Sequence, residues 1–409
     1  MLAGSHYEII NPEVGCEMEG YESRFATGIH DDLSVSALYL EAQSTRLLFI
    51  ALDMVAVPSY RVDRIKRALQ EQMDLAPEQV IISAIHTHSG PTVTDLLLDS
   101  PHIDEGYWAK VTAAAVKAAE RAAADPRPGE LALRVSKVPA GIYANRNRQD
   151  LPYNPDIVQL VVLTADQKLQ ASLFLLGSHP TIMNAKNTQI TADLVGGVRH
   201  YYQAVYGIRP LVMLTDCGDT STRYTRKESS FAEVDTKAKA LVDSLATYRE
   251  KRVSLEKMQV KIVPFGSDYD PITAPQADAL WRKVNDDYDN ATGDRRAELA
   301  GFLSTYRHIR YFGHTHFQTT SEVIDMPGFR IVTYPGELVN AFGSAIRSID
   351  GKPTLLITLA NDYRGYSVDE AEFGQYFESY NSVFLKGEAD KFVEKIRQAE
   401  RSLAAIRES

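Results

Sequence analysis

The 409-residue chain has only two cysteines, Cys16 and Cys217, so no framework of disulfides can hold its fold. No apolar stretch approaches the roughly 20 residues that a membrane helix needs, and the first thirty residues lack the basic and then apolar pattern of a signal peptide. We therefore expect no membrane span. Two cysteines fit a reducing compartment, so we expect the protein in the cytoplasm.

An excess of positive charge is also missing, because 54 Asp and Glu residues outnumber 44 Lys and Arg residues and give a net charge of -10. Nucleic acids and anionic membranes need a basic surface, so neither is expected as a bulk partner. The chain contains no repeat, low-complexity tract or Pro/Gly-rich linker. With 44% hydrophobic residues it can bury a large core, and we expect one domain, 1–409. We expect a small molecule as its partner, and the sequence leaves the oligomeric state open.

Strand-like and helix-like patterns alternate along most of the chain. The expected strands cover residues 34–41, 46–55, 80–85, 131–138, 157–163, 169–176, 211–214, 253–263, 329–333 and 354–359. The expected helices cover 60–73, 103–124, 194–205, 231–249, 276–308 with a break near 291–293, and 388–406. This order indicates an α/β fold in the mixed α+β sense, with mixed β-sheets flanked by helices. The polar segment at about 270–310 is expected as a helical insertion that could act as a lid, and about 388–406 as a C-terminal amphipathic helix.

The segment His86-Thr87-His88-Ser89 follows the apolar run 80–85 and precedes Gly90-Pro91, which ends the strand. If the strand geometry continues through the motif, both imidazoles lie on one face, because alternate residues of a strand share a face. Two neutral imidazoles suit a zinc ion, or a zinc ligand beside an acid/base group. By its spacing alone, the motif fits a loop whose histidines form hydrogen bonds with the backbone better than it fits a metal site.

Four further strand ends carry polar residues or glycine. His179 closes the apolar run 174–176, and Glu337 stands between a strand and a helix. The turn 215–221 carries two carboxylates and a glycine, at which a backbone can approach a ligand closely. Residues 361–366 form a tyrosine-rich turn. Taken singly, each place also fits an ordinary loop histidine, a turn or helix cap, or aromatic packing.

Together and in order, six motifs resemble those of the neutral/alkaline non-lysosomal ceramidases. The motifs are His86-Thr87-His88-Ser89-Gly90-Pro91, Asn145-Arg146-Asn147, His179-Pro180-Thr181, Gly218-Asp219-Thr220-Ser221, Pro335-Gly336-Glu337 and Asn361-Asp362-Tyr363-Arg364-Gly365-Tyr366. The resemblance extends from about Gly20 to about Phe384 and is most specific in the first and fifth motifs. It implies the fold and the activity of the N-terminal, catalytic domain of that family.

The resemblance implies one zinc ion per chain, bound by His86, His179, Glu337 and Tyr366. Zinc accepts imidazole, carboxylate and phenolate ligands, and an adjacent dication favours the phenolate form of a tyrosine. Water activated by zinc would then attack an amide carbonyl. The expected function is therefore zinc-dependent hydrolysis of an amide (N-acyl) bond in a linear substrate.

The resemblance also implies roles for the residues around this zinc site. His88 would exchange a proton with the substrate or bind the developing oxyanion. The catalytic residues implied are His88, Arg146 and Ser221. The substrate-binding residues implied are Asn145, Asp219, Arg223 and Tyr376. The family's oxyanion tyrosine corresponds to Phe377 in a gap-free alignment, one residue from Tyr376.

The chain departs from the family at Ser221-Thr222-Arg223, where the family has Ser-Pro-Asn. The arginines close to the expected contact positions are Arg146, Arg148, Arg223 and Arg226. Guanidinium groups recognise carboxylate and phosphate in a bidentate manner. We therefore expect a soluble, polar and anionic amide as substrate in preference to ceramide. The alternative is that most of these arginines pair with surface acids.

Two other interpretations of the chain stay open at this point. The string Gly313-His314-Thr315-His316, with Gly218-Asp219, is similar to parts of the calcineurin-like metallophosphoesterases, but the Asp-x-His and Gly-Asn-His strings of that family are missing. On this view His314 and His316 would help to bind metal, whereas otherwise they are strand residues or part of a pocket rim. The second alternative is a member of the ceramidase family that binds a ligand without turning it over.

Overall fold

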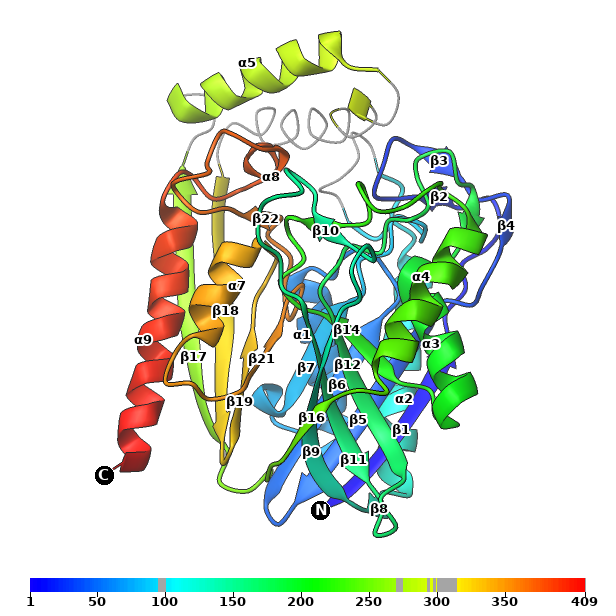
Figure 1. Cartoon of the computed structure of the whole chain (residues 1–409), viewed down its shortest axis with the longest axis vertical. Helices are drawn as coiled ribbons and strands as arrows, with labels where there is room; N and C mark the ends of the chain where they lie inside the picture. The colour runs from blue at the N-terminus through cyan, green and yellow to red at the C-terminus, as the bar shows by residue number, and fades with distance from the viewer. Residues whose placement is uncertain (95–100, 270–274, 293–294, 297–298, 300–314, 409) are drawn as a thin grey trace.

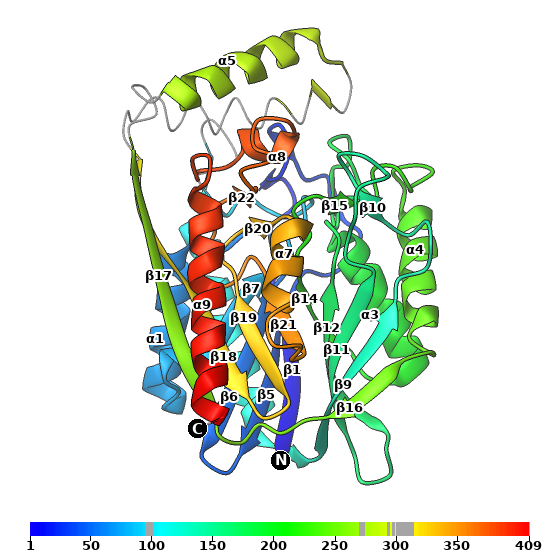
Figure 2. The ribbon, with the colours of Figure 1, turned by 60° about the vertical axis from the view of Figure 1, so that its left-hand side comes forward.

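In the computed structural model, three mixed β-sheets carry helices on their faces (Figures 1 and 2). The structure describes residues 1–408 except 95–100, 270–274, 293–294, 297–298 and 300–314. In each of the three large sheets, antiparallel pairs are combined with one parallel pair. The fold class expected from the sequence, mixed sheets flanked by helices, is confirmed.

The first sheet has the strand order β7-β6-β5-β1-β8. Its strands are β1 (Leu2–Ile9), β5 (Ser34–Ala42), β6 (Thr45–Leu52), β7 (Val80–Ala84) and β8 (Arg127–Pro128). Only β6 and β7 pair in parallel. Strands β5, β6 and β7 are almost wholly buried, because helix α2 (Glu105–Ala124) packs on β1 and β5 and these strands share a core with the second sheet. This burial explains their near-continuous hydrophobic runs. Helix α1 (Ser59–Met73) connects β6 to β7 through the short 3-10 helix Pro77–Gln79.

The second sheet has the strand order β14-β12-β11-β9-β16. Its strands are β9 (Glu130–Lys137), β11 (Asp156–Leu163), β12 (Leu169–Leu176), β14 (Leu211–Leu214) and β16 (Arg249–Arg252). The parallel pair here is β12 with β14. Helices α3 (Asp193–Tyr206) and α4 (Phe231–Ser244) pack on each other beside this sheet (Figure 1), and both contribute to the hydrophobic core that the first two sheets share.

The third sheet has the strand order β17-β18-β19-β21, with β19 and β21 parallel. Its strands are β17 (Gln259–Tyr269), β18 (Thr315–Met326), β19 (Phe329–Thr333) and β21 (Thr354–Ile357). Helices α7 (Asn340–Arg347) and α9 (Glu388–Glu408) pack on it around a second hydrophobic cluster. Helix α9 is the expected C-terminal amphipathic helix, and its Leu403 is buried as expected.

Backbone hydrogen bonds join the three sheets at the segment that follows β21. The amide of Thr358 donates to the carbonyl of Leu214 (2.9 Å), the last residue of β14. The amide of Asn361 donates to the carbonyl of Ile82 (2.8 Å) in β7. The carboxyl ends of β7, β14 and β21 therefore meet, and each of these strands belongs to the parallel pair of its sheet. Ligand sites of α/β sheets usually form at such ends.

Two expected boundaries differ from the structure. The helix expected over 231–249 ends at Ser244, and the strand expected over 253–263 begins only at Gln259. Residues 253–258 run from β16 in the second sheet to β17 in the third, so their alternating pattern does not belong to a strand. Helix α5 (Pro275–Asn290) fills the first half of the expected 276–308 helix and ends at the expected break, whereas much of the second half lies outside the described residues.

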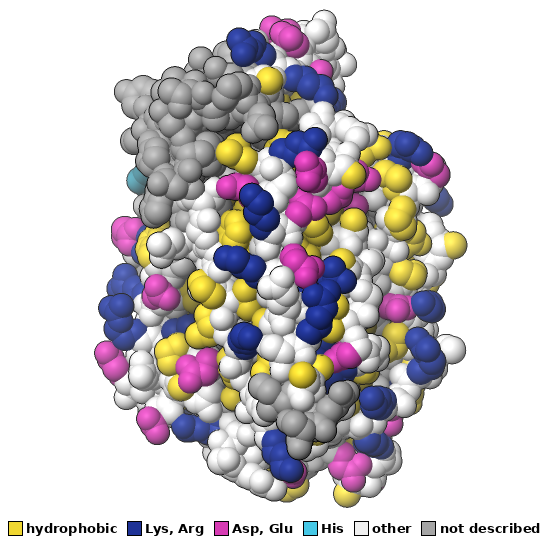
Figure 3. Space-filling view, turned by 90° about the vertical axis from the view of Figure 1, so that its left-hand side faces the viewer, with side chains coloured by type: hydrophobic (Ala, Val, Ile, Leu, Met, Phe, Trp, Pro, Cys, Tyr) yellow, Lys and Arg dark blue, Asp and Glu magenta, His cyan; other side chains and the backbone are white. Residues whose placement is uncertain are grey.

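No helix among the described residues is both long and apolar enough to cross a membrane. On the face that Figure 3 shows, acidic and basic side chains are interspersed among hydrophobic and neutral ones. The described side chains of that face therefore form no continuous basic footprint of the kind that nucleic acid needs.

Candidate active site

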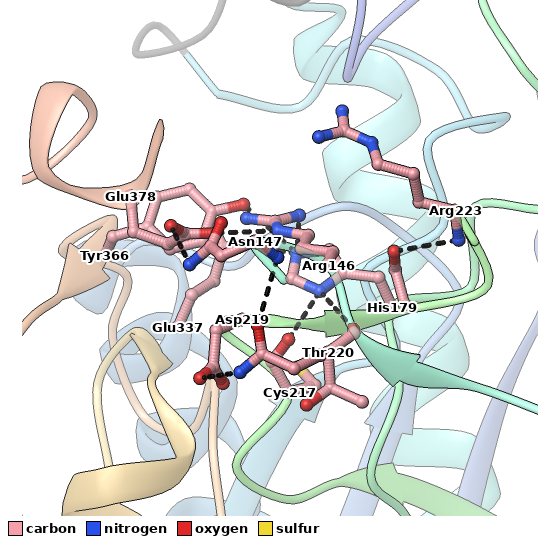
Figure 4. A network of polar contacts seen from close by, with 12 residues as sticks. Arg146, Asn147, His179, Cys217, Asp219, Thr220, Arg223, Glu337, Tyr366 and Glu378 are labelled. Carbon is pink, nitrogen blue, oxygen red and sulfur yellow. Dashed lines mark hydrogen bonds and ion pairs between the residues drawn. The ribbon is translucent and has the colours of Figure 1, made fainter. Parts of the chain in front are cut away.

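Three buried side chains converge where the sheets are joined, and Figure 4 shows two of them, His179 and Glu337. His86 follows β7, His179 follows β12, and Glu337 begins the short strand β20 (Glu337–Leu338) beyond β19. Glu337 Oε2 lies 2.7 Å from His179 Nε2 and 3.1 Å from His86 Nε2. The possible ligand atoms of the three residues all lie within 4.8 Å of one another, so the group could hold a metal ion.

The chain leaves strand geometry before the first histidine of the motif. Strand β7 ends at Ala84, and His86 has a φ of 63°, in the left-handed region that non-glycine residues rarely adopt. A turn therefore brings the two imidazoles together, and the alternation of side chains along a strand does not. The rings of His86 and His88 still meet edge to face, and their Nε2 atoms are 3.2 Å apart.

Backbone carbonyls assign the protons on the two imidazoles that contact Glu337. His86 Nδ1 lies 2.6 Å from the carbonyl oxygen of Val55, and His179 Nδ1 lies 2.6 Å from that of Cys217. A carbonyl can only accept, so each Nδ1 carries a proton, and each Nε2 faces the Glu337 carboxylate. Burial, reinforced by the Arg146 guanidinium, lowers the pKa of His179 to about 4, so this imidazole is neutral near pH 7. In its neutral form each imidazole offers Nε2 as an acceptor beside the Glu337 carboxylate, and a cation fits that arrangement.

Tyr366 adds a phenol to this group from the short strand β22 (Tyr366–Ser367), which pairs in parallel with β20. Its hydroxyl lies 3.1 Å from His179 Nε2. Burial holds the pKa of Tyr366 well above its ordinary value, although the nearby Arg146 guanidinium opposes the shift. An adjacent dication would favour the phenolate instead.

The part of the chain that carries the histidines of this site matches a known family of enzymes. A family model described as neutral/alkaline non-lysosomal ceramidase, N-terminal, matches residues 2–204, which include His86, His88 and His179. The chain belongs to the neutral/alkaline non-lysosomal ceramidase family. It is thus a hydrolase of that family.

Solved ceramidase structures show the same fold along nearly the whole chain. The crystal structure of neutral ceramidase from Pseudomonas aeruginosa superimposes with a TM-score of 0.75 and 16% identity, over 97% of this chain and 73% of that one. A structure of a ceramidase complexed with C2 gives a TM-score of 0.74 and 15% identity, over 98% of this chain and 75% of that one. At this identity the likeness shows a ceramidase fold.

His88 lies beside the group of acceptors in the ceramidase-like site. Gly20 packs against its ring so closely that a Cβ atom there would lie 2.6 Å from His88 Cγ, and the φ of Gly20 is +100°. Burial, with the neighbouring imidazoles, holds the pKa of His88 well below its ordinary value. His88 is therefore a neutral imidazole. Gly20 helps to hold its ring in place, because a residue with a Cβ atom at position 20 would displace the ring.

Arg146 follows the strand β10 (Ala144–Asn145) and is fixed by a carboxylate that the sequence did not reveal. Its Nε donates to Glu378 Oε1 (2.7 Å), and Asn147 Nδ2 donates to Glu378 Oε2 (2.9 Å; Figure 4). The guanidinium lies 5.1 Å above the Tyr366 ring. Glu378 carries no local motif, because its role depends on helix α8 (Phe377–Tyr380) folding over the site.

Tyr363 is a second residue that was not singled out from the sequence. Its hydroxyl donates to Glu337 Oε1 (2.7 Å), the oxygen that does not contact the imidazoles. The signal was present, because Tyr363 lies inside the 361–366 motif. It orients the carboxylate so that Oε2 contacts both His86 and His179.

Asn145 and Asp219 lie beneath the site and connect its elements. Asn145 Nδ2 donates to Asp219 Oδ2 (2.8 Å), and the backbone amide of Asn340 donates to Asp219 Oδ1 (2.8 Å). Burial raises the pKa of Asp219 to about 7. The Asp219 carboxylate thereby connects β10 to the start of α7. These contacts are those of a residue that positions the elements of the site.

A pocket of about 90 Å³ opens above the buried group. Its lining includes His88, Arg146, Ser221, Arg223, Tyr363 and Phe377. Phe377, the gap-free counterpart of the family's oxyanion tyrosine, thus lies in the pocket. Tyr376 precedes it and lines a second, outer pocket.

Asp219, which the phosphoesterase interpretation also uses, is not part of this group. His314 lies outside the described residues, and the backbone of His316 pairs with that of Asp268 in the third sheet. The Asp219 carboxylate bonds Asn145 and the Asn340 amide instead of the histidines. Among the described residues, the group of His, Cys, Asp or Glu side chains that could hold a metal is His86, His179 and Glu337.

Proposed function

We propose that the protein is a zinc-dependent hydrolase that cleaves the amide bond of a linear N-acyl amide. The observation that carries the proposal is the convergence of three possible ligand atoms, His86 Nε2, His179 Nε2 and Glu337 Oε2, while each Nδ1 donates to a backbone carbonyl. Membership of the ceramidase family supports hydrolysis as the reaction class. We propose further that residues 1–409 act as one catalytic domain, because all three sheets bring residues to the site.

His86, His179, Glu337 and Tyr366 would hold the metal. The first three offer lone pairs to one point, and the phenol oxygen of Tyr366 is 3.1 Å from one of them. A zinc ion bound there would supply a Lewis acid that activates water and polarises a carbonyl. Val55 and Cys217 support this set, because their carbonyls fix the tautomer of each imidazole.

The other side chains of the pocket would orient the substrate and move the proton. His88 Nε2 faces the site, so it can pass a proton to the departing amine or donate to the developing oxyanion. Arg146 is held by Glu378 and presents a fixed positive charge beside Tyr366. Ser221 accepts from the backbone amide of Arg223 (3.2 Å), which leaves its hydroxyl proton for a substrate oxygen.

The test combines metal analysis with turnover. Zinc-loaded protein is assayed on a panel of linear N-acyl amides and on an aryl phosphate, with His88→Ala and with His200→Ala as the control. His200 is an exposed histidine on α3, so its loss should change nothing. His88→Ala should keep its zinc and lose roughly 10²–10⁴-fold in rate, the usual effect of losing an acid/base group.

Three results would contradict the proposal. Loss of zinc from His88→Ala would make His88 a ligand and the proposed ligand set wrong. Turnover of the aryl phosphate without turnover of any amide would favour a phosphoesterase. Zinc-loaded wild-type protein that binds amides but cleaves none would be a ligand-binding member of the family.

A further inference from the structure

The pocket above the histidines continues into a larger outer pocket of about 360 Å³. The two pockets share Arg146, Arg223 and Phe377. The outer one also borders helix α5, which contributes Lys283 and Asp287 to its lining. Figures 1 and 2 both show α5 above the strand ends that form the site. A substrate whose amide lies at the histidines would therefore extend past Arg223 toward α5.

The described lining of the outer pocket is strongly cationic. It contains Arg146, Arg223, Lys283 and Arg295 against one acid, Asp287. This excess is local, because the chain as a whole carries a net charge of -10. Clefts lined by one sign of charge concentrate ligands of the opposite sign.

The guanidiniums of the outer pocket lie close enough to repel one another. The charge of Arg146 is matched by the buried Glu378 carboxylate, 2.7 Å away. Figure 4 shows the Arg223 guanidinium above that pair. Burial lowers the pKa of Arg223 to about 10, and repulsion by Arg146 and Arg295 adds to the shift. A bound anion would reduce this repulsion.

Phe377 lies where the two pockets meet and helps to fix the cations. The guanidinium carbons of Arg146 and Arg295 lie 4.5 Å and 5.8 Å from the centre of its ring. Such contacts between cations and aromatic rings hold guanidiniums in place. A preorganised guanidinium can bind carboxylate or phosphate through two parallel hydrogen bonds.

We propose that the outer pocket binds an anionic group, a carboxylate or a phosphate, carried by the substrate, with Arg223 as the principal contact. The inference rests on the proposed amide hydrolysis and names the substrate class for it: short N-acyl amides with an acidic substituent on the amine side or the acyl side. The three shared lining residues, which include two arginines, place the anionic group next to the scissile amide.

The test uses three amides with the same acyl chain. N-octanoylserine carries a carboxylate, N-octanoylserinol carries a hydroxymethyl group in its place, and N-octanoyl phosphoethanolamine carries a phosphate. They are compared on zinc-loaded wild type, Arg223→Gln, Arg223→Lys and the control Arg252→Gln. Arg252 is an exposed arginine of β16 that pairs with Glu130. Arg252→Gln therefore removes one positive charge, as Arg223→Gln does, but at a distance from the site.

Arg223→Gln should lower kcat/KM for the better anionic substrate by roughly 10- to 100-fold, as expected for a lost hydrogen bond to a charged group. Turnover of N-octanoylserinol should change by less than about threefold, since it makes no such bond. Arg223→Lys should restore part of the loss, and Arg252→Gln should behave as wild type. The anionic substrate with the higher kcat/KM on wild type shows whether the outer pocket prefers a carboxylate or a phosphate.

Binding gives a second readout that does not depend on turnover. N-octanoylserine and N-octanoyl phosphoethanolamine are titrated calorimetrically into zinc-loaded His88→Ala, with and without Arg223→Gln. The second substitution should weaken binding of the preferred anion by a similar factor.

Failure of this inference differs from failure of the proposed function. If N-octanoylserinol is cleaved as well as both anionic amides, or if Arg223→Gln affects all three equally, the anionic pocket is wrong while amide hydrolysis stands. If none of the three is cleaved, amide hydrolysis is in doubt, and the binding experiment alone decides the pocket. Equal anion binding with and without Arg223 would then overturn it.

Discussion

Glu337→Gln should stabilise the metal-free protein while it abolishes metal binding. In the structure, Glu337 Oε1 accepts from Tyr363, so a glutamine would keep its oxygen there and place its amide nitrogen where Oε2 now lies. That nitrogen would stand 2.7 Å from His179 Nε2 and 3.1 Å from His86 Nε2. A metal site requires neutral imidazoles, whose Nε2 atoms accept, so the two amide protons can be donated to them and a contact among acceptors becomes a hydrogen-bonded one.

The size of the effect follows from general magnitudes. One net hydrogen bond contributes about 0.5–1.5 kcal/mol to the free energy of unfolding. An unfolding entropy of about 2.1 cal/mol/K per residue makes 1 kcal/mol equal to a Tm change of roughly 1 °C in a chain of 409 residues. Metal-free Glu337→Gln should therefore melt about 1–2 °C above metal-free wild type. Zinc at a hundred times its Kd adds about 2.7 kcal/mol to wild type, roughly 3 °C, and should add nothing to the variant.

The assay is thermal unfolding with chelator and with a titration of zinc, together with metal content by mass spectrometry. Glu370→Gln removes the charge of an exposed glutamate and should leave both the metal-free Tm and the zinc response unchanged. A metal-free Glu337→Gln that melts several degrees below wild type would refute the reasoning. That result would mean that Glu337 forms ion pairs with protonated imidazoles, and that the group is a structural salt bridge rather than a metal site.

Two further predictions concern a glycine of the site and a buried acid remote from it. Gly20→Ala should retain zinc but lose most turnover, because the new Cβ displaces the His88 ring; full activity in steady-state assays would disprove the packing argument. Burial raises the pKa of Glu400 to about 8 although Arg330 Nη1 donates to it at 3.3 Å, and an unfolded glutamate titrates at about 4.3. The native state therefore holds the proton more tightly, so the stability that Glu400 contributes falls as pH rises from about 4.3 to about 8. Denaturant unfolding across this range should show a shallower decline in Glu400→Gln than in wild type, and an unchanged slope would contradict the assignment.

The sequence pointed to the three buried residues that meet at the site, because each one follows an expected strand and lies in a motif that resembles the family's. His86 follows β7, His179 follows β12, and Glu337 follows β19. Strand runs are recognisable locally, since burial on both faces leaves almost no polar residue within them. The order of the motifs then identified the family, which the comparison confirmed.

Contacts between distant segments were decided only by the tertiary structure. The two histidines of the motif meet because His86 adopts a left-handed turn, which no periodicity encodes. Glu378 reaches Arg146 across 232 positions of sequence, and α5 lies over the outer pocket, because whole sheets and helices pack together. Sequence patterns report which face of an element is buried. Which elements share that buried space depends on long-range hydrogen bonds, such as that from Asn361 to Ile82, that join the three sheets at one point.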